Sequence, residues 1–168
     1  GVQTCALPIC DKAFNYSTGE TFLVGAVLEA ATGQPLANYL SERLWKPLGM
    51  QSPAAWWVES PDGAGMGGSG LSATLRDYGR FVQFVLEGGV INGRHVVAEH
   101  WFTESTRSMS DKAPYGYQWW LPQTPNPRHA GAFLGMGIFG QRLYLQPKQE
   151  LAIVVLAARS KQIGRAHV

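Results

Sequence analysis

The chain has 168 residues, of which 45% are hydrophobic and 15% are charged, and its formal net charge at pH 7 is +2. This length suits one folded domain with a real hydrophobic core, and the composition excludes a disordered chain. The charge is too small and too scattered to indicate a nucleic-acid-binding protein. No window holds the roughly eighteen consecutive apolar residues of a membrane span, and no basic segment followed by an apolar one marks a signal peptide. The sequence therefore indicates no compartment.

The two ends of the chain read as one DNA element translated on opposite strands. Residues 4–9, TCALPI, can be written with the codons ACG TGT GCT CTT CCG ATC. The reverse complement of that DNA, read from its second base, encodes Ile-Gly-Arg-Ala-His-Val, which is the sequence of residues 163–168. We therefore expect both ends to derive from a sequencing adapter and exclude them from the fold.

This interpretation sets the expected domain organisation. Residues 1–10 and 163–168 are predicted to be non-native, and residues 11–162 are predicted to form the domain, with the natural beginning of the protein lost before them. Both cysteines, Cys5 and Cys10, lie in the first excluded segment. The remaining sequence therefore predicts no disulfide, zinc-thiolate site or thiol nucleophile.

Helical patterns dominate the first two thirds of the chain. A helix is expected from a cap at Ser17 or Thr18 to a stop at Gly33, because apolar residues repeat between them with a helical period. Further helices are predicted over about residues 35–44, over about 73–87 after a cap at Ser72, and over 98–106. Residues 51–70 read as a loop, and Asn-Gly in "INGRHV" reads as a tight turn.

The last third changes character, because aromatic and β-branched residues gather in four segments: "YGYQWWLP", "AGAFLGMGIFGQ", "RLYLQP" and "ELAIVVLAA". The short Pro-Lys-Gln connection favours an antiparallel hairpin between residues 142–146 and 150–158. Helices followed by strands indicate an α+β fold, in which an antiparallel sheet from the C-terminal third packs against helices.

Tyr16 is the first candidate site residue, because it stands at or just before a predicted helix N-terminus, where unpaired N–H groups make the local field positive. One interpretation is a packed core tyrosine. The other is a tyrosine that moves protons, which requires a nearby cation to lower a phenol pKa that is ordinarily about 10. No lysine is fixed near Tyr16 by the sequence, so both interpretations remain open.

Two glycine-rich stretches stand out. "SPDGAGMGGSG" lacks the Gly-Lys-Ser/Thr ending of a phosphate-binding loop, and we expect it to let backbone pass close to its neighbours. "GMGIFGQ", Gly135 to Gln141, reads as a strand with glycines at alternating positions. It is either the place where a ligand approaches the backbone, with the Ile138 N–H pointing at a reacting oxygen, or a β-bulge between packed strands.

The other chemistry-bearing residues predict little. Of the four histidines, His167 lies in the excluded end, and His95 and His100 have no carboxylate partner at a metal-ligand spacing. His129 reads as a turn or surface residue. No metal and no cofactor is expected. The pairs Trp56-Trp57 and Trp119-Trp120 alternate sides if extended, so one indole of each pair is expected in the core.

Five motifs in order carry a resemblance to a known family: "FNYS" before a helix, "WKPLGM", "GGSGLSATLRDYGRF", "YGYQWW" and "GMGIFGQRLYLQP". The sequence from about residue 11 to 161 resembles the C-terminal part of the serine β-lactamase and penicillin-binding-protein-like hydrolases. Within them it is most similar to the branch of 6-aminohexanoate-dimer hydrolases and esterases.

The resemblance implies a site made of three elements. A Ser-x-x-Lys supplies the nucleophile and its activating lysine, a tyrosine relays protons, and a strand supplies an oxyanion hole. Tyr16 matches the tyrosine, and residues 135–138 match the strand. The Ile138 N–H is then the oxyanion donor, and Met136 and Gly137 contact the substrate.

The sequence departs from the family pattern at three points. Thr18 stands where β-lactamases commonly have asparagine, and Lys-Thr-Gly is absent, which favours small esters or amides over β-lactams as substrates. No Ser-x-x-Lys occurs anywhere in the chain. We therefore expect a fragment that is inactive by itself, taken from a parent hydrolase that works through an acyl-enzyme, and we expect it to expose apolar surface where the missing part docked.

Two alternatives remain. The first is a non-catalytic binding or sensor module with the same fold, and the second is an unrelated α+β domain in which Tyr16 is a core residue. The expected partner of the parent enzyme is a small ester or amide, with no nucleic acid and no membrane span.

Overall fold

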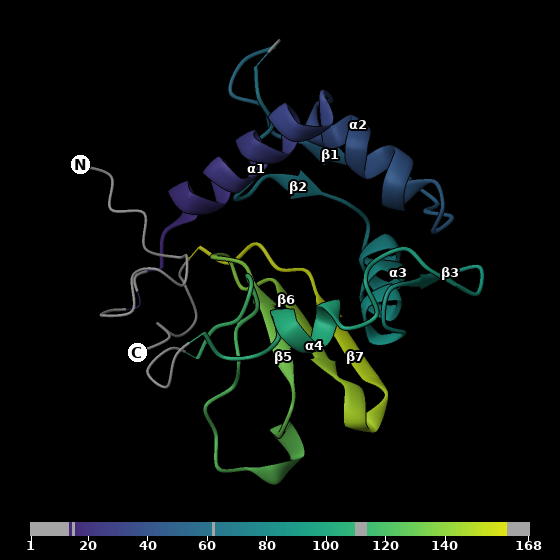
Figure 1. Cartoon of the computed structure of the whole chain (residues 1–168). Coiled ribbons are helices and arrows are strands. Elements are labelled where there is room, and N and C mark those ends of the chain that lie inside the picture. Colours follow the sequence, from purple (N-terminus) through teal and green to yellow (C-terminus); the bar gives the residue numbers. More distant parts are fainter. Residues whose placement is uncertain (1–13, 15, 62, 110–113, 161–168) are drawn as a thin grey trace. The chain divides into compact units, whose positions relative to one another are not determined.

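The computed structural model describes residues 14, 16–61, 63–109 and 114–160 (Figure 1). The chain divides into two compact units, residues 1–74 and 75–168, and each is described by itself. The segments expected to be adapter-derived lie outside the described residues. In the described part, no helix has the length and apolar character needed to cross a membrane.

The first unit begins with helix α1 (Thr18–Thr32), as its apolar period predicts. Ser17 precedes it in an extended conformation, and Gly33 ends it in the left-handed region with φ 67°. The Gly33 N–H donates to the Glu29 carbonyl at 2.8 Å, which satisfies one of the carbonyls left open at a helix end. The predicted bounds of this helix are thus confirmed.

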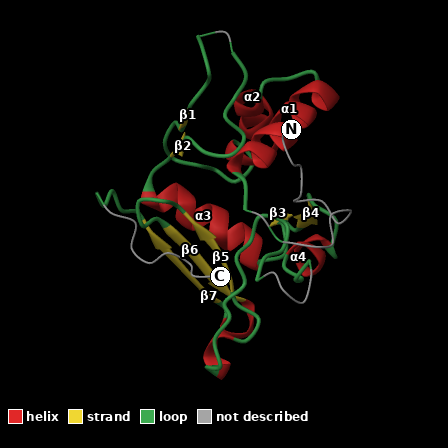
Figure 2. Ribbon diagram, turned by 90° about the vertical axis from the view of Figure 1, so that its left-hand side faces the viewer, coloured by secondary structure: helices red, strands yellow, loops and turns green. Residues whose placement is uncertain are grey.

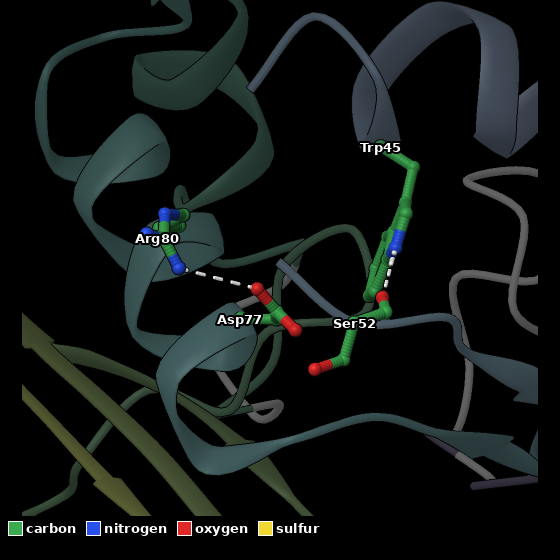
Figure 3. A network of polar contacts seen from close by, with 4 residues as sticks. All are labelled: Trp45, Ser52, Asp77 and Arg80. Carbon is green, nitrogen blue, oxygen red and sulfur yellow. Dashed lines mark hydrogen bonds and ion pairs between the residues drawn. The ribbon is translucent and has the colours of Figure 1, made fainter. Parts of the chain in front are cut away.

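The second predicted helix has about the expected extent, but its hydrogen-bonding pattern changes along its length. Helix α2 (Leu36–Leu40) runs directly into the π-helical turn η1 (Ser41–Trp45). At the exit, the Trp45 indole N–H donates to the Ser52 carbonyl at 2.9 Å, which fixes the course of the chain after the "WKPLGM" break (Figure 3).

The glycine-rich loop lies against α1 with no side chain between them. A Cβ added at Gly67 would lie 2.8 Å from the Thr21 carbonyl oxygen and 3.0 Å from the Gly25 Cα. The same addition at Gly68 would meet Thr18 in the first turn of α1. The interpretation of this stretch as a loop that admits close backbone approach is confirmed.

Two short strands hold the ends of this loop. Strand β1 (Ala55–Trp56) pairs antiparallel with β2 (Leu71–Ser72). Ser72 is therefore a strand residue opposite Ala55, and the prediction that it caps the next helix is wrong. The hydrogen bonds between β1 and β2 hold the backbone of Ser72 extended, so helix α3 (Leu75–Leu86) starts only at Leu75.

The second unit is built on a three-stranded antiparallel sheet in the order β5-β6-β7. The strands are β5 (Phe133–Met136), β6 (Arg142–Gln146) and β7 (Leu151–Val155), and Leu145 pairs with both Phe133 and Ala152. The 3₁₀ turn η3 (Pro147–Gln149) joins β6 to β7, which confirms the predicted hairpin.

Helix α3 covers one face of this sheet (Figure 2). Its inner residues Val82, Phe84 and Val85 are buried, as are Phe133 and Leu145 of the sheet, so these side chains form the core of the unit. Asp77 in the first turn of α3 is fully buried, and Arg80 contacts its carboxylate at 3.2 Å (Figure 3). This helix-on-sheet layer is the predicted α+β arrangement.

Short elements connect α3 to the sheet. Strands β3 (Val90–Ile91) and β4 (Arg94–His95) form a hairpin whose turn residues, Asn92 and Gly93, have φ of 50° and 74°, as the Asn-Gly signal predicts. Helix α4 (Trp101–Ser105) follows within the predicted range 98–106.

The segment "YGYQWWLP" is not a strand, contrary to its predicted character. It forms a turn in which Gln118 adopts φ 64°, and the Tyr117 N–H donates to the Ser105 carbonyl at 2.7 Å. Only Trp120 joins the sheet, through two hydrogen bonds of 2.8 Å with Leu134. The Gly116 position explains the turn, because a Cβ there would overlap the Ser105 carbonyl.

The pair Trp56-Trp57 divides as alternation predicts, whereas Trp119 and Trp120 are both half-buried. The half-buried Trp56 donates its indole N–H to the carbonyls of Met66 and Ser69, whereas Trp57 is exposed. Trp119 packs edge-on against the core residue Phe133 with ring centroids 4.9 Å apart, and Trp120 packs against Tyr115 at the same distance.

Strand β7 exposes an apolar stripe. Alternation along the strand places Ala152 and Val154 beside α3, and the opposite face carries Leu151, Ile153 and Val155, all three of which are exposed. A strand that faces water normally carries polar residues on that side. This stripe fits the expectation that the chain exposes apolar surface.

We predict that the expressed chain binds a hydrophobic dye such as ANS or self-associates, because the β7 stripe is open to solvent. The variant Ile153→Lys should lower dye fluorescence, whereas Gln149→Lys, on the neighbouring turn η3, should leave it unchanged. Dye titration and light scattering measure the two effects. A monomeric chain that binds no dye and melts in one cooperative step would contradict the prediction.

We predict that Gly67→Ala destabilises the first unit by about 2 kcal/mol or more, since the new methyl group meets backbone rather than a movable side chain. Gly19→Ala is the matched control in α1, because its Cβ would meet only the Ser17 Oγ at an ordinary 3.6 Å. Urea unfolding followed by tryptophan fluorescence gives both values. Equal free energies of unfolding for the two variants would show that the close backbone contact does not stabilise the first unit.

Candidate active site

Tyr16 lies two residues before the start of α1, at the predicted place. Its side chain is 53% exposed, so the phenol is not a packed core residue of this chain. Ser17 follows in the extended conformation, with φ −136° and ψ 116°, and its side chain makes no capping bond. The backbone therefore places Tyr16 next to the N-terminus of α1, where the helix dipole is positive.

The glycine loop fixes the end of α1 that follows Tyr16. Gly68 lies against Thr18, the first residue of the helix, at a distance that no side chain would tolerate. Further along the helix, the Glu29 carboxylate accepts hydrogen bonds from the amides of Leu36, at 2.8 Å, and Gly65, at 3.4 Å. These contacts hold both ends of α1 against the loop and so set the direction in which Tyr16 leaves the helix.

The second candidate element is the turn that joins β5 to β6, residues 137–141. The Gly137 N–H donates to the Gln141 carbonyl at 3.0 Å, and the Gly140 N–H donates to the Gly137 carbonyl at 3.2 Å. The Gln141 side chain closes the turn from within, because its Oε1 accepts the Phe139 N–H at 3.1 Å. The amides of residues 137, 139 and 140 are thus all used inside the turn.

The Ile138 amide differs from its neighbours. Among the described residues it has no hydrogen-bond partner, and its side chain is 64% exposed. An N–H held in place by bonded neighbours and directed at no protein acceptor is available to a ligand oxygen. This amide is the group that the sequence analysis singled out.

Additional contacts hold the same turn. The Arg142 guanidinium donates to the carbonyls of Gly137, at 3.3 Å, and Gln141, at 2.8 Å. From the segment after β7, the Arg159 N–H donates to the Phe139 carbonyl at 3.1 Å. Sequence reasoning missed Gln141 and Arg142 as supports of this turn. Their position directly after the glycine repeat was the available signal, but a polar residue there is common in any turn.

The expected strand over residues 135–141 is wrong in part. Strand β5 ends at Met136 and β6 starts at Arg142, so residues 137–141 belong to the turn. The reason is the Gly137–Gln141 hydrogen bond, which closes a tight turn before the strand can continue. A Cβ at Gly137 would overlap the Gln141 side-chain oxygen, so a larger residue there would displace that oxygen from the Phe139 N–H. Met136 remains a half-buried strand residue paired with Arg142.

The candidate residues fall in different compact units. Tyr16 belongs to the first, and Met136, Gly137 and Ile138 belong to the second. The structure describes each element separately, so their convergence on one site remains a prediction.

Other titratable groups do not add to the site. Burial raises the pKa of the Tyr78 phenol above its usual value of 10.0, so this tyrosine of α3 keeps its proton at neutral pH. His129 lies in a 3₁₀ turn, half-buried, where its Nδ1 lies 2.8 Å from the Tyr144 hydroxyl. The described residues contain no group of three or more histidine, cysteine, aspartate or glutamate side chains that fits a metal ion.

Comparisons with known proteins agree on one family. The family model described as Beta-lactamase matches residues 10–167. The 6-aminohexanoate-dimer hydrolase of Paenarthrobacter ureafaciens is 32% identical, and the match covers 86% of this chain and 39% of that protein.

Solved structures give the same result. One from Bacillus anthracis, provisionally named a 6-aminohexanoate-dimer hydrolase, superposes with a TM-score of 0.80 at 29% identity, covering 90% of this chain and 40% of that one. A β-lactamase from Mycobacterium bovis shares the fold, with a TM-score of 0.68 at 20% identity over 89% of this chain and 57% of that one.

The chain therefore spans about two fifths of the length of the 6-aminohexanoate-dimer hydrolases that it matches. These comparisons confirm the expected family, the β-lactamase-related hydrolases, and the expected α+β fold class. The chain belongs to the β-lactamase family, and it has the fold of the serine β-lactamase and penicillin-binding-protein-like hydrolases.

Proposed function

We propose that this chain is the oxyanion-hole and tyrosine-bearing part of a serine hydrolase that cleaves amide or ester bonds through an acyl-enzyme. The observation that carries the proposal is the Ile138 amide, which lacks a partner among the described residues while the amides of Gly137, Phe139 and Gly140 are bonded. An oxyanion hole needs a donor of this kind, fixed in advance and not already satisfied by the protein.

The roles follow from the chemistry of acyl transfer. A serine outside this chain attacks the carbonyl carbon of the substrate, and the carbonyl oxygen gains negative charge, which the Ile138 N–H stabilises. Tyr16 takes the serine proton and returns one to the leaving amine or alcohol. The paired lysine of the Ser-x-x-Lys element supplies the positive charge beside the phenol.

The substrate class follows from the relatives and from the residues present. A relative at 32% identity carries the name 6-aminohexanoate-dimer hydrolase, which denotes a dimer of 6-aminohexanoate as its substrate. The chain has Thr18 and no Lys-Thr-Gly strand, which favours small esters or amides over β-lactams. Met136 and Gly137 would contact the substrate beside the oxyanion.

The oxyanion role predicts the effect of removing one N–H. In the completed parent enzyme, Ile138→Pro deletes the donor and should lower kcat for a nitrophenyl ester about 10²- to 10³-fold. Ile138→Ala keeps the N–H and truncates only an exposed side chain, so it should stay within about threefold of the wild type, because exposed substitutions are mild. Steady-state kinetics measure both, and equal losses for the two variants would exclude the amide from the chemistry.

The proton-relay role predicts a second loss. Tyr16→Phe keeps the ring and removes the hydroxyl, and it should lower kcat of the parent about 10²- to 10⁴-fold with a small change in KM. The control is Tyr39→Phe on α2, which should keep full activity. Full activity of Tyr16→Phe would refute the relay and would favour a purely structural Tyr16.

The experiment that tests the whole proposal is recovery of the upstream gene. We expect an intact Ser-x-x-Lys before residue 11, hydrolysis of nitrophenyl esters and of an aminohexanoate dimer, and no activity of this chain alone. A parent without that motif, and without hydrolysis of either substrate, would support the alternative, a non-catalytic binding or sensor module with this fold.

A further inference from the structure

The direction of the Ile138 N–H depends on the carbonyl oxygen of Gly137, because the two groups belong to one peptide unit. A peptide unit is planar and trans, so its C=O and its N–H point in opposite directions. The Gly137 carbonyl accepts a hydrogen bond from the Gly140 N–H at 3.2 Å and another from the Arg142 guanidinium at 3.3 Å. The donors that hold this carbonyl therefore also set the direction of the Ile138 N–H.

Arg142 is itself held firmly, because it is the first residue of the central strand β6. Its backbone pairs with Met136 of β5 on one side and with Val155 of β7 on the other. The same Nη1 that contacts the Gly137 carbonyl also donates to the Gln141 carbonyl at 2.8 Å. The sheet thus anchors the guanidinium, which reaches back into the turn between β5 and β6.

No carboxylate in the described part of the chain forms an ion pair with Arg142. The ion pairs found there belong to other arginines, namely Arg80 with Asp77 and Arg107 with Glu104. Arg142 is half-buried, so water and salt screen its charge less than that of an exposed arginine. A charged donor makes a stronger hydrogen bond than a neutral one, and it polarises the peptide unit that accepts the bond. The Ile138 N–H is therefore a stronger donor with this guanidinium than without it.

We propose that Arg142 is a positioning residue of the oxyanion hole and that it acts through the Gly137–Ile138 peptide unit. This inference rests on the proposed function, because it gives Arg142 the task of orienting and polarising the donor of that function. When the serine attacks, negative charge develops on the substrate oxygen, and the polarised N–H stabilises that charge. The substrate carries no such charge before the attack, so Arg142 acts on kcat rather than on KM.

Steady-state kinetics of the completed parent enzyme test the inference. Arg142→Met removes the charge and keeps an unbranched side chain, and it should lower kcat for a nitrophenyl ester about 10- to 100-fold with KM unchanged within about threefold. Arg142→Lys keeps a positive charge, and its kcat should lie at least about threefold above that of Arg142→Met. Full kcat in Arg142→Met, or no recovery in Arg142→Lys, overturns the inference.

The matched control is Arg128→Met, which removes the same charge from the same compact unit. Arg128 is exposed and lies at the other end of β6, where the Gln146 side chain donates to its carbonyl at 2.8 Å. This variant should keep full activity, because its guanidinium supports no part of the β5–β6 turn. A loss of kcat as large as that of Arg142→Met would show an effect of net charge alone and would overturn the inference.

A double-mutant cycle tests whether Arg142 acts through the amide. Ile138→Pro has no N–H left to orient, so adding Arg142→Met should lower kcat by less than about twofold more. A further loss as large as in the wild-type background overturns the inference. If Arg142→Met does not fold, the same cycle with Arg142→Lys decides by the same criterion.

The cycle also separates the two proposals. Full activity of Ile138→Pro defeats the proposed function, and the role of Arg142 falls with it. A large loss in Ile138→Pro beside full activity in Arg142→Met defeats the inference alone, and the oxyanion role of the amide stands.

Discussion

The contact on which the first unit depends is the approach of the glycine loop to helix α1 without side chains between them. Gly67 and Gly68 lie so close to the helix that even a methyl group would overlap its backbone. Close packing of backbone against backbone leaves no room for rearrangement, because there is no side chain that could rotate away. The place of the α1 N-terminus, and hence of Tyr16, is set by this contact rather than by a cap at Ser17.

The second unit achieves a similar rigidity by other means. Its β5–β6 turn is fixed by the hydrogen bond that the Gln141 Oε1 accepts and by those that the Arg142 guanidinium and the Arg159 N–H donate. Each of these bonds is modest in net free energy, but together they fix the peptide planes on both sides of Ile138. A donor fixed in this way needs no reorganisation when charge develops on a substrate oxygen, which is the condition for electrostatic catalysis.

The sequence could predict the features that depend only on residues close together in the chain. The apolar period and Gly33 determine α1, Asn92-Gly93 determines a hairpin, and Pro147 to Gln149 determine another. It could not predict the start of α3 at Leu75, because pairing of Ser72 with Ala55 is a tertiary event that overrides a capping preference. Likewise "YGYQWWLP" has strand composition, yet Gly116 and the Ser105 carbonyl make it a turn. The Ile138 amide was predicted from the glycine pattern and the family resemblance, whereas its supports Gln141 and Arg142 depend on a turn geometry that composition does not encode.

The apolar residues that face outward favour a larger fold over a module of the present size. A module that functions as residues 75–160 alone would gain nothing from Leu151, Ile153 and Val155 on an open sheet face, and such faces promote aggregation. The same holds for Val24 and Val27 on α1. Both surfaces are explained if the chain is part of a larger fold whose remainder covers them. The exposed apolar faces on α1 and β7 therefore lead to one conclusion, a larger fold of which this chain is a part, as the proposed function requires.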